Sequence, residues 1–234
     1  PLRVRVAGGA LSSADALAVL NGANVMAIGD GSSDNWEVLQ FAKADLVAPD
    51  TWDLSLRLRG QAGTDGIQPA QWPAGSTVVL LDRSLQQIDL AASARGLARH
   101  YRIGVTARGY DDPTVVSRIE AFDGIGLRPY PVSHLRAAGA AGAEVSLTWR
   151  RRTRIEGDNW QQTEVPLGED TEAYLVRVMA GATIVAEYEE FQPSFIYSAS
   201  AQTADGLSGA FNIAVAQVSL RFGPGPFRQV AVGI

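Results

Sequence analysis

The chain has 234 residues, of which 46% are hydrophobic and 19% are charged, and its formal net charge at pH 7 is −5. This length and composition predict a globular protein with two domains of about 100–130 residues each. The negative charge does not favour nucleic-acid binding, and no apolar run approaches the ~20 residues of a membrane span. Cysteine is absent, which excludes disulfides and thiolate-ligated zinc.

The N-terminal part of the chain predicts short elements joined by tight turns. The sequence starts at Pro1 without an initiator methionine, so we expect it to be a piece of a longer protein. Residues 2–6 alternate as in a strand, and residues 16–20 follow polar capping residues as in a short helix. Residues 24–28 predict a second strand, and residues 29–35 a hairpin loop.

A pair of longer strands is predicted next. Residues 36–47 carry apolar side chains on both faces, which predicts a central strand or a strand with a bulge. Residues 51–59 alternate with period two, which predicts one apolar face and one solvated face. Residues 60–66 contain three glycines and predict a tight reversal. A loop flanked by prolines, residues 69–75, then leads into a strand at residues 76–82.

The region up to residue 128 contains further strand patterns and almost no long helix pattern. Residues 88–99 are weakly helical or irregular, and residues 100–106 and 114–122 predict strands. Short strands separated by turn signals indicate an all-β sandwich or partly open barrel for residues 1–128. Alternating glycine and proline at residues 124–131 predict a stiff connector. We therefore place the domain boundary between residues 128 and 129.

Residues 129–234 have the size and strand rhythm of a fibronectin type III domain. Val145, Leu147 and Trp149 point to one side, as in the strand that carries the core tryptophan of that fold. The other strands expected from the pattern are residues 173–178, 183–187, 194–197, 211–215 and 225–232. The predicted fold class is thus all-β: an N-terminal β-sandwich or partly open barrel, followed by a fibronectin type III-like sandwich.

Details near the C-terminus depart from the usual pattern of that domain. Phe211 stands where a tyrosine usually hydrogen-bonds back to the chain, so either this corner is unsupported or the assumed register is shifted. The apolar phase changes after Gln217, which predicts a bulge.

Some residues are of types that could carry chemistry, but their spacing favours structural roles. His100 and His134 fall in different predicted domains, so structural roles are favoured over a catalytic triad. Residues 30–34 have oxygen ligands spaced as in a small calcium loop but lack the later bidentate glutamate, so a hairpin turn is favoured. No catalytic residue, metal site or cofactor is predicted.

Charged clusters also favour structural interpretations. Residues 150–154 form the main basic cluster, and pairing with nearby carboxylates is favoured over a phosphate or lipopolysaccharide contact. The acidic residues needed for glycoside hydrolysis would have to face each other across a cleft. Asp111, Asp112 and the glutamates at 187, 189 and 190 are sequence neighbours, and we expect them to be solvated.

An ordered series of motifs carries a resemblance to a known family. The motif Leu58-Arg59-Gly60-Gln61-Ala62-Gly63-Thr64-Asp65 follows a strand at residues 36–41 and a run at residues 20–24, and it precedes Gln71-Trp72-Pro73-Ala74-Gly75. With residues 94–99 and the last hundred residues, this series resembles the C-terminal region of the tail-tip (host-specificity, "megatron") protein of gene transfer agents. Gene transfer agents are phage-like particles, and their tail-tip protein is one of the phage tail-tip and baseplate proteins.

The resemblance implies a structural protein of the tail tip rather than an enzyme. It implies assembly in the cytoplasm, a place in the tail of the particle and an extracellular location after release. The implied partners are the hub and distal tail proteins, two further copies in a homotrimer of the full-length protein, and a cell-surface glycan or outer-membrane receptor. A carbohydrate-binding module attached to a cell-envelope glycosidase is the alternative.

Recognition by such a protein is expected in exposed loops on a rigid β scaffold. The candidate binding residues are Trp72 in the first domain and Asp158, Asn159 and Trp160 in the second. The loop at residues 223–226 completes the candidate set.

Overall fold

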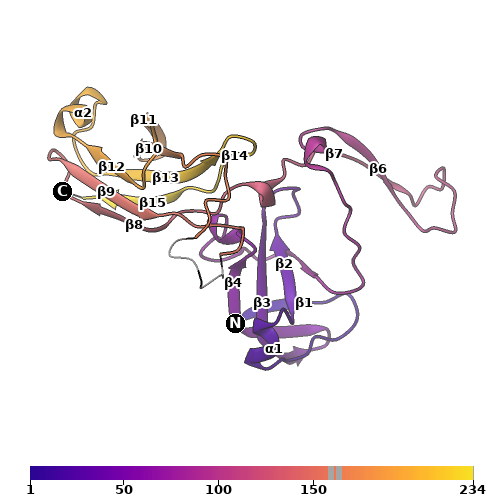
Figure 1. Ribbon diagram of the computed structural model, residues 1–234. Coiled ribbons are helices and arrows are strands. Elements are labelled where there is room, and N and C mark those ends of the chain that lie inside the picture. Colours follow the sequence, from indigo (N-terminus) through magenta and orange to yellow (C-terminus); the bar gives the residue numbers. More distant parts are fainter. Residues whose placement is uncertain (158–160, 162–164, 234) are drawn as a thin grey trace. The chain divides into compact units, whose positions relative to one another are not determined.

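The computed structural model describes residues 1–157, 161 and 165–233 (Figure 1). It confirms the all-β class, since the two α-helices of the described residues, α1 (Ala16–Leu20) and α2 (Ala199–Ala204), are each shorter than two turns. Neither helix is long and apolar enough to cross a membrane. The described chain divides into two compact units, Pro1–Gly126 and Leu127–Ile234. This division lies two residues before the predicted boundary.

The first unit is built on one antiparallel five-stranded sheet, a half-barrel with the strand order β1-β4-β3-β2-β5. Of the two predicted forms it is therefore the partly open barrel, because no second sheet packs on this one to make a sandwich in the described part of the unit. The strands of the half-barrel are β1 (Leu2–Arg5), β2 (Val25–Gly29), β3 (Trp36–Ala48), β4 (Thr51–Gln61) and β5 (Thr77–Leu80).

The core of the first unit lies against the central strands of this sheet. Its buried side chains are Val4, Leu11, Met26, Ile28, Leu39, Phe41 and Leu54. The register between β3 and β4 shifts at Val38/Gln40 and again at Leu46/Ala48. The predicted irregularity of this strand is thus confirmed, and it explains why β3 carries apolar side chains on both faces.

The alternation predicted along β4 is wrong beyond its first half. Leu54 is fully buried, but Leu56 is 67% exposed and Leu58 is 38% exposed. Leu56 has a φ of 50°, which lies outside the β region and interrupts the alternation of faces along the strand. The single apolar face expected for residues 51–59 therefore ends at Leu54.

The rest of the first unit contains a separate hairpin. Among the residues that the structure describes, β6 (Arg99–Ile103) and β7 (Val116–Glu120) pair only with each other. Short 3-10 turns lie at Thr64–Gly66, Ala92–Ala94 and Ile125–Leu127. The segment predicted as weakly helical or irregular contains the second of these turns.

The second unit is a sandwich of two antiparallel sheets. One sheet has the order β11-β10-β13-β14 with β15 also paired to β13, and the other has the order β12-β9-β8. This is the fibronectin type III-like arrangement expected from the sequence. The strands are β8 (Ser133–Ala138), β9 (Val145–Arg150), β10 (Tyr174–Ala180), β11 (Thr183–Glu190), β12 (Ser194–Tyr197), β13 (Phe211–Ser219), β14 (Gly223–Pro224) and β15 (Arg228–Val232).

The core of the second unit is centred on Trp149, as predicted. Its side chain is 2% exposed, and its ring meets that of Tyr174 edge to face at 5.2 Å between centroids. Val145 and Leu147 point into the same core. The alternation along β9 thus places one face against the other sheet and the other face in contact with solvent.

The bulge predicted after Gln217 is wrong. β13 pairs with β10 in continuous register from Asn212 to Gln217. Its last two residues, Val218 and Ser219, pair with β14. The apolar phase changes because the strand ends at Ser219, and Leu220 in the following turn is 72% exposed.

The corner that lacks the usual tyrosine is supported in another way. The hydroxyls of Tyr188 and Tyr197 both donate to Asp205 Oδ2, at 2.8 and 2.6 Å. Asp205 is the C-cap residue of α2, which joins β12 to β13, and Phe211 packs edge to face on Tyr197. Burial and the bonds to Asp205 raise the pKa of both tyrosines, so both hydroxyls stay protonated and donate.

Candidate functional site

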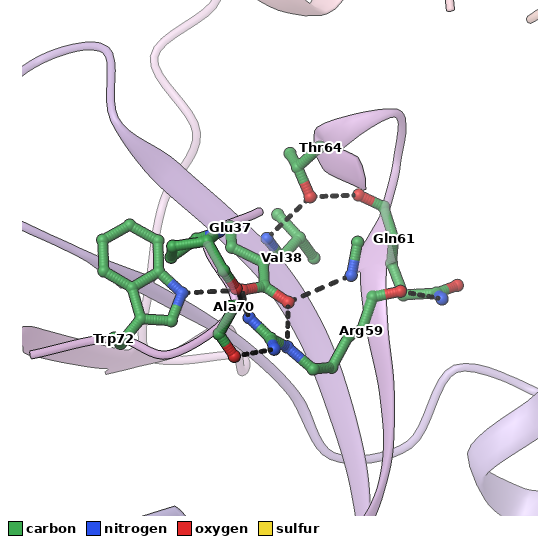
Figure 2. Close-up of polar contacts among 9 residues, drawn as sticks. Glu37, Val38, Arg59, Gln61, Thr64, Ala70 and Trp72 are labelled. Atoms are coloured by element: carbon green, nitrogen blue, oxygen red, sulfur yellow. Dashed lines mark hydrogen bonds and ion pairs between the residues drawn. The ribbon is translucent and has the colours of Figure 1, made fainter. Parts of the chain in front are cut away.

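Trp72 is the one predicted binding residue that the structure describes, and its side chain is not an exposed contact. The indole is half-buried and packs against the core of the half-barrel. Its Nε1 donates to Glu37 Oε2 at 2.6 Å. The expectation of an exposed aromatic at this position is therefore corrected, because a buried carboxylate holds the ring (Figure 2).

Glu37 lies at the start of β3 and is fully buried. Arg59 on β4 binds it with two parallel bonds, Nε to Oε1 at 2.9 Å and Nη2 to Oε2 at 2.6 Å. The Gly60 amide donates to Oε1 at 3.1 Å. With Trp72 this makes four donors on one carboxylate (Figure 2), which is the capacity of its two oxygens. We call this group the Glu37 cluster.

The cluster holds the loop that precedes β5. Arg59 also donates to the carbonyl oxygens of Pro69 and Ala70, at 2.9 and 3.3 Å. One guanidinium therefore joins β3, β4 and the proline-flanked segment. This arrangement uses the planar fork of arginine, which lysine cannot reproduce.

Burial by itself would raise the pKa of Glu37, but the hydrogen bonds from Arg59, Trp72 and Gly60 outweigh it and hold that pKa below its usual range. The pKa of Arg59 is raised by the same pairing. Glu37 is consequently a charged acceptor with no oxygen left to take a proton from a substrate. Its chemistry is that of a structural anchor.

The turn after Arg59 requires the residues found there. Gly60 has a φ of 62°, and a Cβ at this position would lie 2.7 Å from Asp65 Cα, so only glycine fits without a shift. Gly63 also has positive φ. Thr64 Oγ1 accepts from the Val38 amide at 3.0 Å and donates to the Gln61 carbonyl at 2.7 Å. The turn thereby bonds back to the bulged part of β3.

The Glu37 cluster was missed in the sequence analysis, which placed Arg59 on a solvated face and Trp72 in an exposed loop. A possible signal was Glu37 itself, because an acidic residue inside an apolar strand that is buried on both faces needs a cation nearby. The motif Arg59-Gly60 supplies that cation and one further donor.

The other predicted binding residues cannot be compared in the same way. Asp158, Asn159 and Trp160 lie outside the described residues. The candidate loop at residues 223–226 contains β14, which pairs with the end of β13. A Cβ on Gly225 would meet the Pro129 carbonyl oxygen at 2.3 Å, so this segment packs closely against the start of its own unit.

Residues 30–34, whose oxygen ligands are spaced as in a calcium loop, form the favoured hairpin turn. Asp30 accepts from the Ser32 amide and the Asn35 side chain, and bonds from these two residues lower its pKa to about 2. The segment is thus a hairpin turn. The described residues contain no group of three or more His, Asp or Glu side chains that could hold a metal ion.

The basic cluster is divided among separate partners. Arg151 pairs with Glu172 at 3.1 Å and Arg154 with Glu169 at 2.9 Å. The guanidinium of Arg152 lies over the ring of Tyr130. Arg151 and Arg154 thus pair with nearby carboxylates, as the sequence favours, whereas Arg152 contacts an aromatic ring.

The two compact units and their strand orders define a β protein whose second unit is a fibronectin type III-like sandwich. Residues 1–79 of this protein, 79 of its 234 residues, match the family model described as "Rcc01698-like, C-terminal". The match contains the whole Glu37 cluster and ends at β5. No match was found among curated proteins.

Several solved structures have a weak likeness to this chain. Domains d3–d4 of rat CD45 are 9% identical over 82% of this chain and 94% of that chain, with a TM-score of 0.34. The FN5 domain of Drosophila Lar is 13% identical over 45% and 98%, at 0.28. Domains FN1–FN3 of chicken CNTN1 are 11% identical over 90% and 57%, at 0.31. Because these TM-scores are low, the fold rests on the strand order.

Proposed function

We propose that this chain is a structural component of the tail tip, or baseplate, of a phage-like particle of the gene transfer agent type. Its role is tail assembly and recognition or attachment at the host surface, without catalysis. Two observations support the proposal: the ordered motif series that resembles the tail-tip protein, and the match of residues 1–79 to the Rcc01698-like C-terminal model.

The Glu37 cluster is the structural observation that agrees best with this role. Three motif residues that carry the resemblance, Arg59, Gly60 and Trp72, donate to the buried carboxylate. A fourth, Thr64, donates to the Gln61 carbonyl of the same motif. These contacts connect the strands and the loop before β5 into one scaffold. They occupy both oxygens of Glu37, the one fully buried carboxylate of the half-barrel. A scaffold of this kind presents loops for recognition.

The proposed partners follow from the resemblance. They are the hub and distal tail proteins, further copies of the chain in a trimer of the full-length protein, and a glycan or outer-membrane receptor on the host. The proposed location is the tail of the particle, which is extracellular after release.

Immunogold labelling of purified particles tests the proposal. Antibodies raised against residues 1–234 are expected to label the distal end of the tail, and the same antibodies should reduce adsorption of particles to host cells. Antibodies against the major capsid protein serve as the control. Label on the capsid, or adsorption unchanged by antibody that has bound the tip, would contradict the proposed role.

The carbohydrate-binding alternative predicts exposed tryptophan or tyrosine rings on a flat sheet face. Among the described tryptophans, Trp149 is buried and Trp36, Trp52 and Trp72 are half-buried. The strongly exposed tyrosine is Tyr110, at 75%, in the loop of the β6–β7 hairpin rather than on a sheet face. These observations do not favour the alternative. Strong binding of the isolated chain on a glycan array would favour it.

A further inference from the structure

The segment from residue 81 to residue 123, which we call the arm, has almost no core of its own. Ala94 is its one buried residue. A two-stranded hairpin without a covered face is marginally stable in water, and apolar surface on this scale marks an interaction site. Its large exposed apolar side chains are Leu81, Leu85, Ile88, Leu90, Leu97, Ile103, Val105, Tyr110, Val116, Ile119 and Phe122.

The hairpin in the arm also has open strand edges. β6 pairs with β7 alone, so its outer edge presents unpaired backbone donors and acceptors. This strand carries Arg99, His100 and Arg102 and no acidic residue. Tyr101 between them packs on Phe122, but its covered hydroxyl has no hydrogen-bond partner in the structure. The outer edge of β6 is therefore a basic, unpaired strand.

One edge strand of the second unit, β11, carries the opposite charge. β11 is the outermost strand of its sheet and pairs with β10 on one side only. It carries Glu187, Glu189 and Glu190, and Glu187 also accepts from Arg177 of β10. Three carboxylates along an edge disfavour pairing with another β11, because like charges would face each other. The same carboxylates suit a basic strand.

We propose that β6 of one copy adds to the free edge of β11 of a second copy, in antiparallel orientation. The register with the best charge match places Arg102 opposite Glu187 and Arg99 opposite Glu190. Ile103 then lies opposite Ala186, on the side of the sheet that faces the core. The chain carries both complementary edges, so a second copy provides the partner that the arm lacks.

The first experiment measures self-association of the full chain. Sedimentation of the full chain over concentrations from about 1 µM to 1 mM should show a monomer–oligomer equilibrium that weakens as salt is raised. Two charge-reversed variants, Glu189→Arg/Glu190→Arg and Arg99→Glu/Arg102→Glu, should each associate at least about tenfold more weakly than the unmodified chain. Arg5→Glu, at an exposed position on β1, is the control and should leave the equilibrium unchanged.

A mixture of the two charge-reversed variants provides the sharper comparison. In the mixed complex the unmodified arm of one variant meets the unmodified β11 of the other, so the mixture should associate more strongly than either variant alone. Unfolding curves identical to that of the unmodified chain would show that both variants fold. A mixture that stays monomeric would overturn the pairing.

Disulfide trapping fixes the register and the identity of the partner. Because the chain has no cysteine, one sample can carry Ile103→Cys and another Ala186→Cys. Oxidation of the mixture should give a 103–186 cross-link between copies, whereas Val116→Cys mixed with Ala186→Cys should give much less, since β7 lies one strand further away. Absence of the 103–186 link, or a chain that is monomeric at every concentration, would refute the proposal.

Discussion

Glu37 shows how one residue determines a loop. A fully buried carboxylate is unfavourable unless charge and hydrogen bonds compensate it, and here Arg59, Trp72 and the Gly60 amide do so together. The compensating groups come from β4 and from the segment before β5. The loop conformation is therefore linked to the ionisation of one side chain.

Glu37→Gln should destabilise the first unit by about 2–4 kcal/mol, because an amide cannot accept all four hydrogen bonds and leaves Arg59 without its counter-charge. Chemical denaturation, followed by tryptophan fluorescence, measures the change. Asp45→Asn, an exposed position on the same strand, is the control and should change the stability by less than about 0.5 kcal/mol. Equal effects of the two substitutions would contradict the anchoring role.

The same carboxylate predicts a dependence of stability on pH. The pKa of Glu37 is lowered in the folded chain, so its contribution is complete above the unfolded-state pKa of about 4.3 and is lost as pH falls through the lower folded-state value. Unfolding free energies measured between pH 7 and pH 3 should fall more steeply for the unmodified chain than for Glu37→Gln. Parallel curves would mean that Glu37 does not titrate with folding.

Among the elements, the turn after β4 depends on a close approach of two backbone segments. Gly60→Ala should cost more than Gly75→Ala, although both glycines have positive φ, at 62° and 90°. A Cβ at Gly60 would lie 2.7 Å from Asp65 Cα, whereas one at Gly75 has no neighbour within 4 Å. Thermal unfolding should separate the two variants by about 1 kcal/mol or more. Similar losses would show that the backbone angle alone matters.

The corner between β12 and β13 depends on Asp205 in place of the usual tyrosine. Asp205→Ala should leave the hydroxyls of Tyr188 and Tyr197 without their shared acceptor and destabilise the second unit by about 1–3 kcal/mol. Thr203→Ala on the same helix is the comparison. Near-ultraviolet circular dichroism reports the tyrosines, and an unchanged spectrum and midpoint for Asp205→Ala would contradict this role.

At the scale of the whole molecule, stability is unevenly distributed. Each unit has one compact core, whereas the arm has a single buried residue, Ala94. Trypsin should therefore cleave the dilute chain first at arginines between residues 81 and 123, identified by mass spectrometry of the fragments. Association through β6 should slow these cuts at high concentration. First cuts inside β3 or β13 would contradict this distribution.

Much of the second unit was predictable because its signals are local. Period-two alternation around Trp149 defines a strand with one buried face, and similar patterns identify β10, β12 and β13. The same reasoning failed at Leu56, where a positive φ breaks the alternation. It also failed after Gln217, because a strand end and a bulge produce the same change of apolar phase.

The candidate site was less predictable than the fold. The sequence indicates Trp72 as a binding residue because it lies in a proline-flanked loop, and exposed loops on a rigid scaffold often serve recognition. Its actual partner, Glu37, is 35 residues away in sequence. No local pattern reports such a contact, since it depends on which strands become neighbours in the half-barrel.

The amino-acid sequence alone determined the all-β class, the approximate division into two units and the core tryptophan of the sandwich. These follow from the spacing of apolar side chains and turn residues along a short stretch of chain. Only the tertiary structure decided that Glu37, Arg59 and Trp72 form one cluster and that Asp205 binds two tyrosines. It also decided that the arm has no core of its own. All three depend on which distant segments become neighbours. Burial strengthens the contacts in the two clusters, because water no longer competes for their charged and polar groups.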